Sequence, residues 1–313
     1  MKNAFLLLLF TSSLFIACDK DDNNSGDPTI AKESYMLPGD TLYPEGIAYK
    51  SGAGQFYTGS TTTGDILSVN VQTGEVKTFA SGQAQGRKVA TGLKLDNNDR
   101  LWICGGADNK IQVLSSAGTL LKSWDTKALF GSGFINDCII DTGYVYFTDS
   151  QIKKIYRTSV KGDPGNLEEW LTFTDAQIPY AAAGTNANGI VNTADNKYLI
   201  IVVSTSGKLY RIDKTTKAIA EITLNASVAS GDGMYLDGTT LYVSRNATNQ
   251  IFPVTLTADY SQGTVGAGFG TNLLFNTTIA KAGKYFLAVN GQLNRRASPT
   301  PQLPFTVSRV TIP

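Results

Sequence analysis

The segment Gly233-Met234-Tyr235-Leu236-Asp237, followed closely by Leu241-Tyr242-Val243-Ser244, decides the fold, because this pair of short apolar runs recurs six times along the chain. The first run of each copy begins at a marker residue, and the six markers are Gly46, Gly92, Asp137, Gly189, Gly233 and Thr278. Successive markers lie 46, 45, 52, 44 and 45 residues apart. Repeats of about 40–50 residues made of short strands are typical of β-propeller blades.

The last copy predicts how the ring closes. Each copy continues with a third apolar strand, and a more polar fourth strand follows a turn. The sixth copy ends at Pro313, directly after its third strand, which would leave an unpaired edge. We therefore expect a segment around residues 33–42 to supply the missing strand. Because almost no stretch has a helical period, the sequence predicts an all-β fold, a six-bladed β-propeller over residues 33–313 closed by this N-terminal strand.

Composition narrows the classes of function. The 313 residues carry a formal net charge of +1 without a basic stripe, which argues against nucleic acid as a partner. The sequence contains no histidine, and this excludes Ser-His-Asp triads and histidine-bound zinc. Acid–base chemistry would therefore rest on carboxylates, lysine, tyrosine or a metal-bound water. We expect a monomer whose partner is a small-molecule substrate.

The first residues resemble a bacterial lipoprotein signal peptide. Met1-Lys2-Asn3 is a short positive start, and the apolar run of residues 4–16 is too short to span a bilayer. The run ends in a stretch that resembles a lipobox, with Ala17 before Cys18. We expect residues 1–17 to be removed, Cys18 to be lipidated, and residues 18–32 to form a polar tether. The alternative is an ordinary signal peptide with an incidental cysteine.

The predicted tether also contains a candidate export signal. Lys20-Asp21-Asp22, close behind Cys18, resembles the export signal that places Bacteroidetes lipoproteins on the outer face of the outer membrane. This resemblance predicts an outer-membrane lipoprotein, exposed at the cell surface and attached to the membrane through its N-terminal lipid only. The alternatives are a solvated linker without a signal and a lipoprotein that faces the periplasm.

One position in each copy is expected to face the central channel, namely the residue just before the marker. These residues are Glu45, Thr91, Asn136, Asn188, Asp232 and Thr277. Two carboxylates packed together repel each other unless a cation lies between them. Oxygen ligands without histidine or cysteine favour Ca²⁺, with Mg²⁺ or Mn²⁺ as alternatives. The competing interpretation is that these Asn and Asp residues only cap turns at strand ends.

Four motifs around these positions resemble those of the SMP-30/gluconolactonase-like family: Tyr43-Pro44-Glu45-Gly46, Phe134-Ile135-Asn136-Asp137, Ala187-Asn188-Gly189-Ile190 and Gly231-Asp232-Gly233-Met234. The resemblance covers the ring from Pro44 to about Pro313. It implies a six-bladed propeller that hydrolyses a lactone with one divalent metal. It further implies that Glu45, Asn188 and Asp232 bind the metal and that Asn136 is a further ligand or a substrate contact. Asp232 would also be the base that activates water.

The chain departs from the sugar-lactone hydrolases of this family at two places. Those enzymes have an arginine, which holds substrate hydroxyls, where this chain has Phe134. The Gly-Lys that follows their Asn-Asp pair is here Cys138-Ile139. We therefore expect a ligand more apolar than a sugar acid, in contact with Phe134. The second hypothesis is a non-catalytic ligand-binding propeller with a structural channel metal. No motif points to the chemistry of the related strictosidine synthases.

Loops entering the same face suggest further contacts. In the loops of residues 83–88 and 178–186, we predict that Arg87, Lys88 and Tyr180 touch the substrate. The pair Arg295-Arg296 is interpreted as an exposed turn in preference to an anion site. Cys104 and Cys138 fall in adjacent blades, and we favour two reduced core cysteines over a disulfide.

Overall fold

A computed structural model describes residues 29–313 of the chain. The predicted signal peptide, the predicted lipidation at Cys18 and most of the predicted tether lie outside the described residues. Among the described residues, no helix has the length and apolar character needed to cross a membrane.

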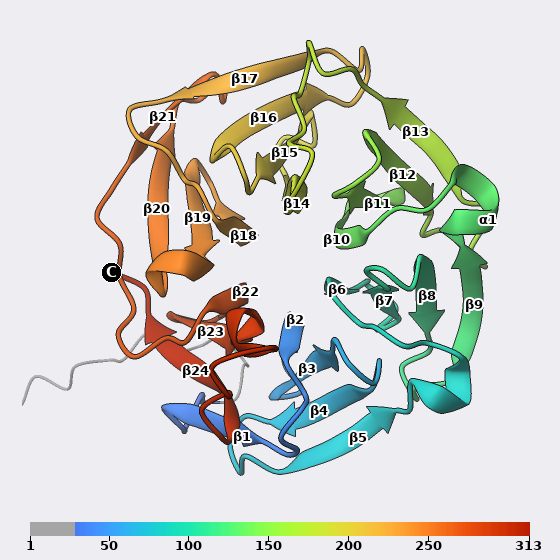
Figure 1. Cartoon of the computed structure of the whole chain (residues 1–313), viewed down its shortest axis with the longest axis vertical. Coiled ribbons are helices and arrows are strands. Elements are labelled where there is room, and N and C mark those ends of the chain that lie inside the picture. The colour runs from blue at the N-terminus through green and yellow to red at the C-terminus, as the bar shows by residue number, and fades with distance from the viewer. Residues whose placement is uncertain (1–28) are drawn as a thin grey trace, which may run out of the picture.

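The described part of the chain is an all-β ring of sheets around a central axis, in a propeller-like arrangement (Figure 1). Three four-stranded antiparallel sheets follow one another along the chain. The first contains β2 (Pro44–Lys50), β3 (Gln55–Ser60), β4 (Ile66–Asn70) and β5 (Val76–Ala80). The second contains β6 (Leu93–Leu95), β7 (Leu101–Cys104), β8 (Lys110–Leu114) and β9 (Leu120–Asp125). The third contains β10 (Ile135–Ile140), β11 (Tyr144–Asp149), β12 (Lys154–Ser159) and β13 (Glu168–Thr172).

The next sheet has eight strands and consists of two antiparallel meanders. One meander is β14 (Ala187–Asn192), β15 (Tyr198–Val203), β16 (Lys208–Asp213) and β17 (Ile219–Leu224). The other is β18 (Gly231–Asp237), β19 (Thr240–Arg245), β20 (Gln250–Leu256) and β21 (Gln262–Val265). Their outermost strands, β17 and β21, join in parallel through the pairs Thr223–Gln262 and Leu224–Gly263. Each meander therefore repeats the strand order of the four-stranded sheets.

The last sheet joins the two ends of the described chain. It contains β22 (Asn276–Ala282), β23 (Tyr285–Asn290) and β24 (Phe305–Thr311), and β1 (Ser34–Leu37) pairs antiparallel with β24 at its outer edge. Arg309 N also donates a 2.8 Å hydrogen bond to Glu33 O. The prediction that an N-terminal segment supplies the missing strand is confirmed. Closure removes the exposed edge that the last meander would otherwise present to solvent.

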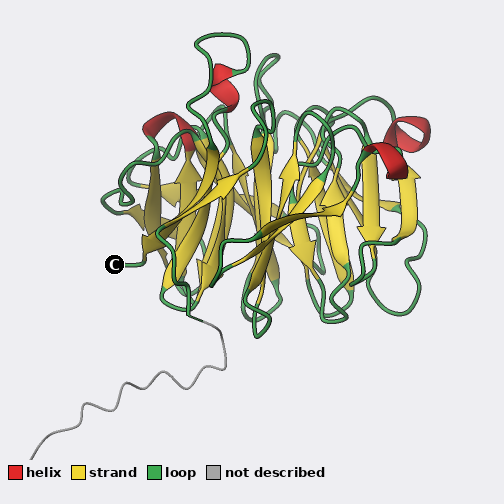
Figure 2. Cartoon of the chain, turned by 90° about the horizontal axis from the view of Figure 1, so that it is seen from below, coloured by secondary structure: helices red, strands yellow, loops and turns green. Residues whose placement is uncertain are grey.

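Helical structure is confined to short segments on one face of the ring (Figure 2). These are α1 (Thr126–Phe130) and the 3₁₀ turns η1 (Gln83–Gln85), η2 (Asn246–Thr248) and η3 (Leu293–Arg295). They belong to the connections that surround the candidate site described below.

The apolar core lies between adjacent sheets. In one cluster, Trp102 and Trp124 pack against Ile135 and Phe147 of the next sheet. Cys104 and Cys138, which contribute to the same cluster, are free and buried, as predicted. Packing of this kind between neighbouring sheets fixes the angles at which the innermost strands meet at the axis.

Candidate active site in the central channel

A recurrent backbone irregularity aims the predicted channel residues at the axis. The pairing register shifts in five innermost strands, between Pro44 and Ile47, Ile135 and Cys138, Ala187 and Ile190, Gly231 and Met234, and Asn276 and Ile279. Each shift encloses the channel residue and its marker. A β-bulge places an extra residue in one strand and re-aims its side chain. The sequence repeat therefore produces the same change of direction in five strands.

The small marker residues let the innermost strands approach one another closely. A Cβ atom at Gly46 would lie 2.1 Å from the carbonyl oxygen of Thr91 on the neighbouring strand. At Gly189 the corresponding Cβ would lie 2.2 Å from the carbonyl oxygen of Asp232. Both distances are far below van der Waals contact, so glycine is required at these two positions. The close approach brings the residues before the markers into one small space.

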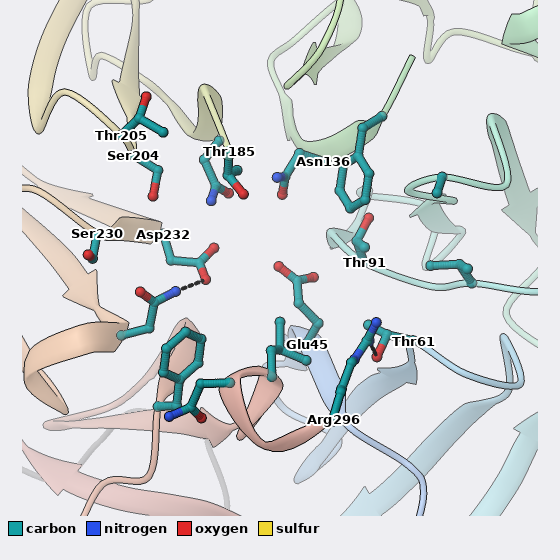
Figure 3. A pocket seen from close by; sticks show the side chains of 18 residues that line it. Glu45, Thr61, Thr91, Asn136, Thr185, Ser204, Thr205, Ser230, Asp232 and Arg296 are labelled. Atoms are coloured by element: carbon teal, nitrogen blue, oxygen red, sulfur yellow. Dashed lines mark hydrogen bonds between the residues drawn. The ribbon is translucent and has the colours of Figure 1, made fainter. Parts of the chain in front are cut away.

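All four predicted metal ligands line one cavity of about 430 Å³ at this end of the channel. Glu45, Asn136 and Asp232 point toward its middle (Figure 3), and Asn188 lines it as well. Of the other two residues predicted to face the channel, Thr91 lines the cavity. Thr277 does not line it and is fully buried. Thr277 Oγ1 donates a 2.8 Å hydrogen bond to the carbonyl oxygen of Glu45 and so holds that strand in place.

Hydrogen bonds leave amide oxygens available to a cation. Asn136 Nδ2 donates to Ser150 Oγ at 2.9 Å, and Ser150 Oγ donates to the carbonyl oxygen of Ala187 at 2.6 Å. The Asn136 Oδ1 atom accepts no hydrogen bond from a described residue. Asn188 lines the same cavity, and its side chain favours the charged form of the Asp232 carboxylate. Because an amide stabilises a carboxylate through its nitrogen, the Asn188 oxygen is also left for other partners.

The two cavity carboxylates are held in an unfavourable environment. Burial, reinforced by the negative charge of Asp137, raises the pKa of Asp232 from 3.8 to about 7. Burial and the charges of Asp232 and Asp137 raise the pKa of Glu45 well above its ordinary value. Both carboxylates are almost fully buried. A positive charge placed between them would relieve the repulsion.

Beneath these carboxylates lies a second layer of charge. Asp137 Oδ1 accepts a 2.8 Å hydrogen bond from Cys138 N, whereas Asp137 Oδ2 is buried without a hydrogen-bond partner in the described chain. Burial, the largest single influence, lowers the pKa of Lys94, but Asp137, the neighbouring cysteines and Glu45 together outweigh it, and the pKa is raised. Lys94 is therefore an ammonium ion that offsets part of the negative charge below the cavity.

The donor set fits a hard divalent cation. Glu45 Oε2 is buried and has no hydrogen-bond partner among the described residues. Such an atom costs free energy unless another group binds it. Two carboxylates and two amide oxygens are ligands that Ca²⁺ accepts. No cluster of three or more His, Cys, Asp or Glu residues poised for a metal occurs in residues 29–313, so any site here depends on the amides.

The structure adds two lining residues that sequence reasoning missed. Asn246, at the start of η2, donates a 2.8 Å hydrogen bond from Nδ2 to Asp232 Oδ2. Arg296, interpreted from the sequence as part of an exposed turn, is exposed and also lines the cavity. The charge of Asp137 below the cavity was predictable, because Asp137 is the one marker with a charged side chain. Asn246 and Arg296 follow the strands in loops, where no repeat predicts a side chain's direction.

The substrate contacts predicted from loops need correction. Phe134 does line the cavity, but Arg87, Lys88 and Tyr180 do not. The Arg87 side chain is buried, where Nε donates to the Gly64 carbonyl at 2.6 Å. Arg87 Nη1 also donates to Gln112 Oε1 in β8, so this side chain links the first two sheets. The Tyr180 hydroxyl donates to the carbonyl oxygen of Asp149 at 2.8 Å.

Comparisons with known proteins give the fold and no more. No protein-family model matches the chain, and no curated protein matches its sequence. Among solved structures, the Malassezia sympodialis allergen Mala s 1 is 14% identical, with a TM-score of 0.67 over 89% of this chain and 96% of that one. A calcium-binding protein, regucalcin, from Agrobacterium tumefaciens is 15% identical, with a TM-score of 0.65 over 90% and 95%. A catalytically inactive virginiamycin B lyase from Staphylococcus aureus is 16% identical, with a TM-score of 0.61 over 89% and 98%.

Proposed function

We propose that this chain is a six-bladed propeller that hydrolyses a lactone or a related ester in the channel cavity, with one bound divalent cation, Ca²⁺ in preference to Mg²⁺ or Mn²⁺. The blade count treats each meander of the eight-stranded sheet as one blade. The observation that carries the proposal is the convergence of Glu45, Asn136, Asn188 and Asp232 on one cavity, with a buried carboxylate oxygen that lacks a partner. The similarity to a protein described as calcium-binding supports the choice of ion.

Asp232 is the group best placed to accept a proton. Its carboxylate is oriented by a 2.8 Å hydrogen bond from Asn246 Nδ2. A pKa of about 7 matches a general base that works near neutral pH. We therefore assign Asp232 the role of general base, which accepts a proton from the attacking water. Glu45, Asn136, Asn188 and Asp232 itself would hold the cation, which when bound supplies a Lewis acid for the carbonyl oxygen.

The rest of the cavity suits an apolar substrate with a few polar groups. Phe134, Phe275 and Val89 provide apolar surface, and Ser204, Ser230 and their neighbours provide hydroxyl groups. An apolar wall binds the body of a ligand and excludes water, while scattered hydroxyls fix its orientation. This lining supports an ester or lactone of moderate polarity rather than a heavily hydroxylated sugar acid.

The lyase seen among the similar structures is a poorer guide to the chemistry. That protein is described as catalytically inactive when one histidine is replaced by alanine. The sequence of this chain has no histidine. A lyase mechanism that depends on a histidine therefore has no equivalent group here, whereas water attack assisted by a carboxylate needs none.

The second candidate is a binding propeller in which the cation only stabilises the channel. It is favoured by Phe134, which stands where the sugar-lactone hydrolases carry the arginine that holds substrate hydroxyls. Under either function we propose a monomer anchored through a lipid on Cys18 at the outer face of the outer membrane. The proposed lipid and location rest on the sequence alone.

The function is tested by incubating the protein with a panel of lactones and aryl esters. Hydrolysis is measured as the acid released at constant pH. We expect turnover that a chelator abolishes and that Ca²⁺ restores, and that Glu45→Gln removes. Lys281→Gln, a change at a salt bridge with Asp237 outside the cavity, is the matched control and is expected to keep full activity. Saturable binding without turnover of any member would support the binding propeller instead.

A further inference from the structure

The cavity lining contains a single positive charge. Of the 18 described residues that line it, Arg296 is the one Lys or Arg. Figure 3 shows this side chain beside Thr61 at the edge of the cavity, on the side where Glu45 lies. Arg296 follows η3 in the connection between β23 and β24, so it comes from a loop and not from the repeated inner strands.

The guanidinium group is oriented by two neighbours. Arg296 Nη2 donates a hydrogen bond to Thr61 Oγ1, and Thr61 Oγ1 in turn donates to the carbonyl oxygen of Tyr43 at 2.5 Å. The guanidinium carbon lies 5.5 Å from the centre of the Tyr43 ring, within the range of a cation–π contact. Stacking of this kind restricts the plane of the guanidinium and reduces the entropy lost when it binds a ligand.

The loop that carries Arg296 is fixed from several directions. Gln292 Nε2 donates to the Gln302 carbonyl at 2.8 Å, and Gln302 N donates back to Gln292 Oε1 at 2.8 Å. The Tyr43 hydroxyl donates to the carbonyl oxygen of Arg295 at 3.0 Å. Arg296 is thus presented by a tethered loop with a defined conformation, which is what a recognition residue requires.

Buried Arg100 satisfies its guanidinium group within the protein, and Arg296, which is exposed, does not. Arg100 donates to Asp96 Oδ2 at 2.7 Å and to the carbonyl oxygens of Gly162 and Val160. In contrast, Arg296 makes its one hydrogen bond to a described residue at Thr61. Its remaining N–H donors are free to bind a group that enters the cavity.

The charge balance of the site indicates what that group is. Glu45 and Asp232 carry two negative charges, and the proposed divalent cation would cancel both. The charge of Arg296 is then left over, so the loaded cavity has a net charge that favours a monoanion. An arginine fork matches a carboxylate geometrically and binds it through two parallel hydrogen bonds.

We infer that the ligand of this cavity carries one carboxylate on an apolar body and that Arg296 is the specificity-determining residue that binds this carboxylate. The inference rests on the proposed function, because it takes the cavity to be the substrate site. The preferred substrate is then a lactone or ester with a carboxylate some distance from the bond that is hydrolysed. The alternative role for Arg296 is that of a counterion to Glu45 without ligand contact.

A matched pair of probes separates recognition from catalysis. Ketopinate is a rigid bicyclic ketone with one carboxylate, and hydrolysis cannot consume it. Its primary amide has the same shape and no charge. Binding of each probe to the Ca²⁺-loaded protein is measured by calorimetry. The variants are Arg296→Gln, Arg296→Lys and, as the control, Arg295→Gln, because Arg295 donates to the Thr300 carbonyl and does not line the cavity.

The expected result is a preference of at least tenfold for ketopinate over its amide in the wild type and in Arg295→Gln. This preference should disappear in Arg296→Gln and return in part in Arg296→Lys, while amide affinity stays within about twofold. No preference in the wild type, or an equal loss for both probes in Arg296→Gln, would overturn the inference. Because the readout is binding and not turnover, a failure of the lactonase proposal would leave this preference intact.

Discussion

The two ends of one channel differ sharply although the same innermost strands form both. The end described above gathers Glu45, Asn136, Asn188 and Asp232 around a cavity of about 430 Å³. The opposite end, a few residues further along the same strands, is a cavity of about 270 Å³ with a largely apolar lining. Its lining includes Ile47, Ile139, Val191, Met234 and Ile279.

In five innermost strands a bulge separates the polar end from the apolar end. Within the bulge a polar side chain turns to the axis, and beyond it ordinary alternation resumes with apolar residues. Lys94 and Asp137 lie at the boundary, where the positive charge of one offsets the negative charge of the other. The comparison teaches that a propeller can confine its carboxylates to one end of the channel by repeating a single local irregularity, since the opposite cavity is lined by Lys94 and Lys281 but by no Asp or Glu.

The largest expected effect comes from a substitution at the polar end of the channel, the end with Glu45, Asn136, Asn188 and Asp232. Asp232→Asn keeps the shape of the side chain but removes the proposed base and one cation ligand. We expect lactone hydrolysis to fall by roughly 10²–10⁴-fold, the usual contribution of a positioned general base. Initial rates, compared at the Ca²⁺ concentration that gives the wild type its full activity, measure the effect. If Asp232→Asn hydrolyses lactones as fast as the wild type, Asp232 is not the base.

The next effect tests the boundary between the two ends. Lys94→Met removes the ammonium and leaves the buried Asp137 uncompensated, which should lower the free energy of unfolding by roughly 3–5 kcal/mol. Urea unfolding measures the loss. The matched control is Lys281→Met, which breaks the partly exposed salt bridge between Lys281 and Asp237. This substitution should lower the free energy of unfolding by at most about 1 kcal/mol. Adding Asp137→Asn to Lys94→Met should recover part of the loss.

The third prediction concerns how the stability of the metal-free protein depends on pH, which reports on the buried carboxylate at the polar end. Folded Asp232 keeps its proton up to about pH 7, whereas its ordinary pKa is 3.8. The folded state therefore binds more protons between these values, and the metal-free protein should lose stability as the pH rises through this window. The change should be on the order of 4 kcal/mol, measured by urea unfolding at successive pH values. Equal slopes for wild type and Asp232→Asn would contradict it.

The smallest effect concerns a supporting residue of the polar end. Asn246→Ala removes the 2.8 Å hydrogen bond to Asp232 Oδ2. Loss of a partner that orients a metal ligand usually weakens metal binding by about 10-fold or more. We expect a drop in Ca²⁺ affinity of about that size, with little change in the free energy of unfolding of the metal-free protein. Calorimetric titration measures the affinity, and an unchanged value would show that Asn246 does not position Asp232.

The sequence predicted the part of the site that repeats. Glu45, Asn136, Asn188 and Asp232 share a position in the repeat, so one alignment placed all of them at the axis. The closing strand was predictable because a propeller leaves no edge unpaired. Residues outside the repeat were not predictable in the same way.

The errors concern loops. Arg87 has the right charge and lies in a loop, but its side chain turns inward to the Gly64 carbonyl. Arg296 lies in a loop that resembles a solvated turn, yet contacts with Tyr43 and Thr61, about 235 residues earlier in the chain, bring it to the cavity. Such long-range contacts depend on the closed ring and leave no local signal in the sequence.

Titration of Ca²⁺ into chelator-treated protein, followed by calorimetry, tests most directly whether the polar end of the channel is a cation site. We predict one saturable Ca²⁺ site per chain in the wild type and in Lys281→Met, and its loss in Asp232→Asn and Glu45→Gln. No binding to the wild type, or binding that both site variants retain, would contradict the assignment of the channel as a cation site.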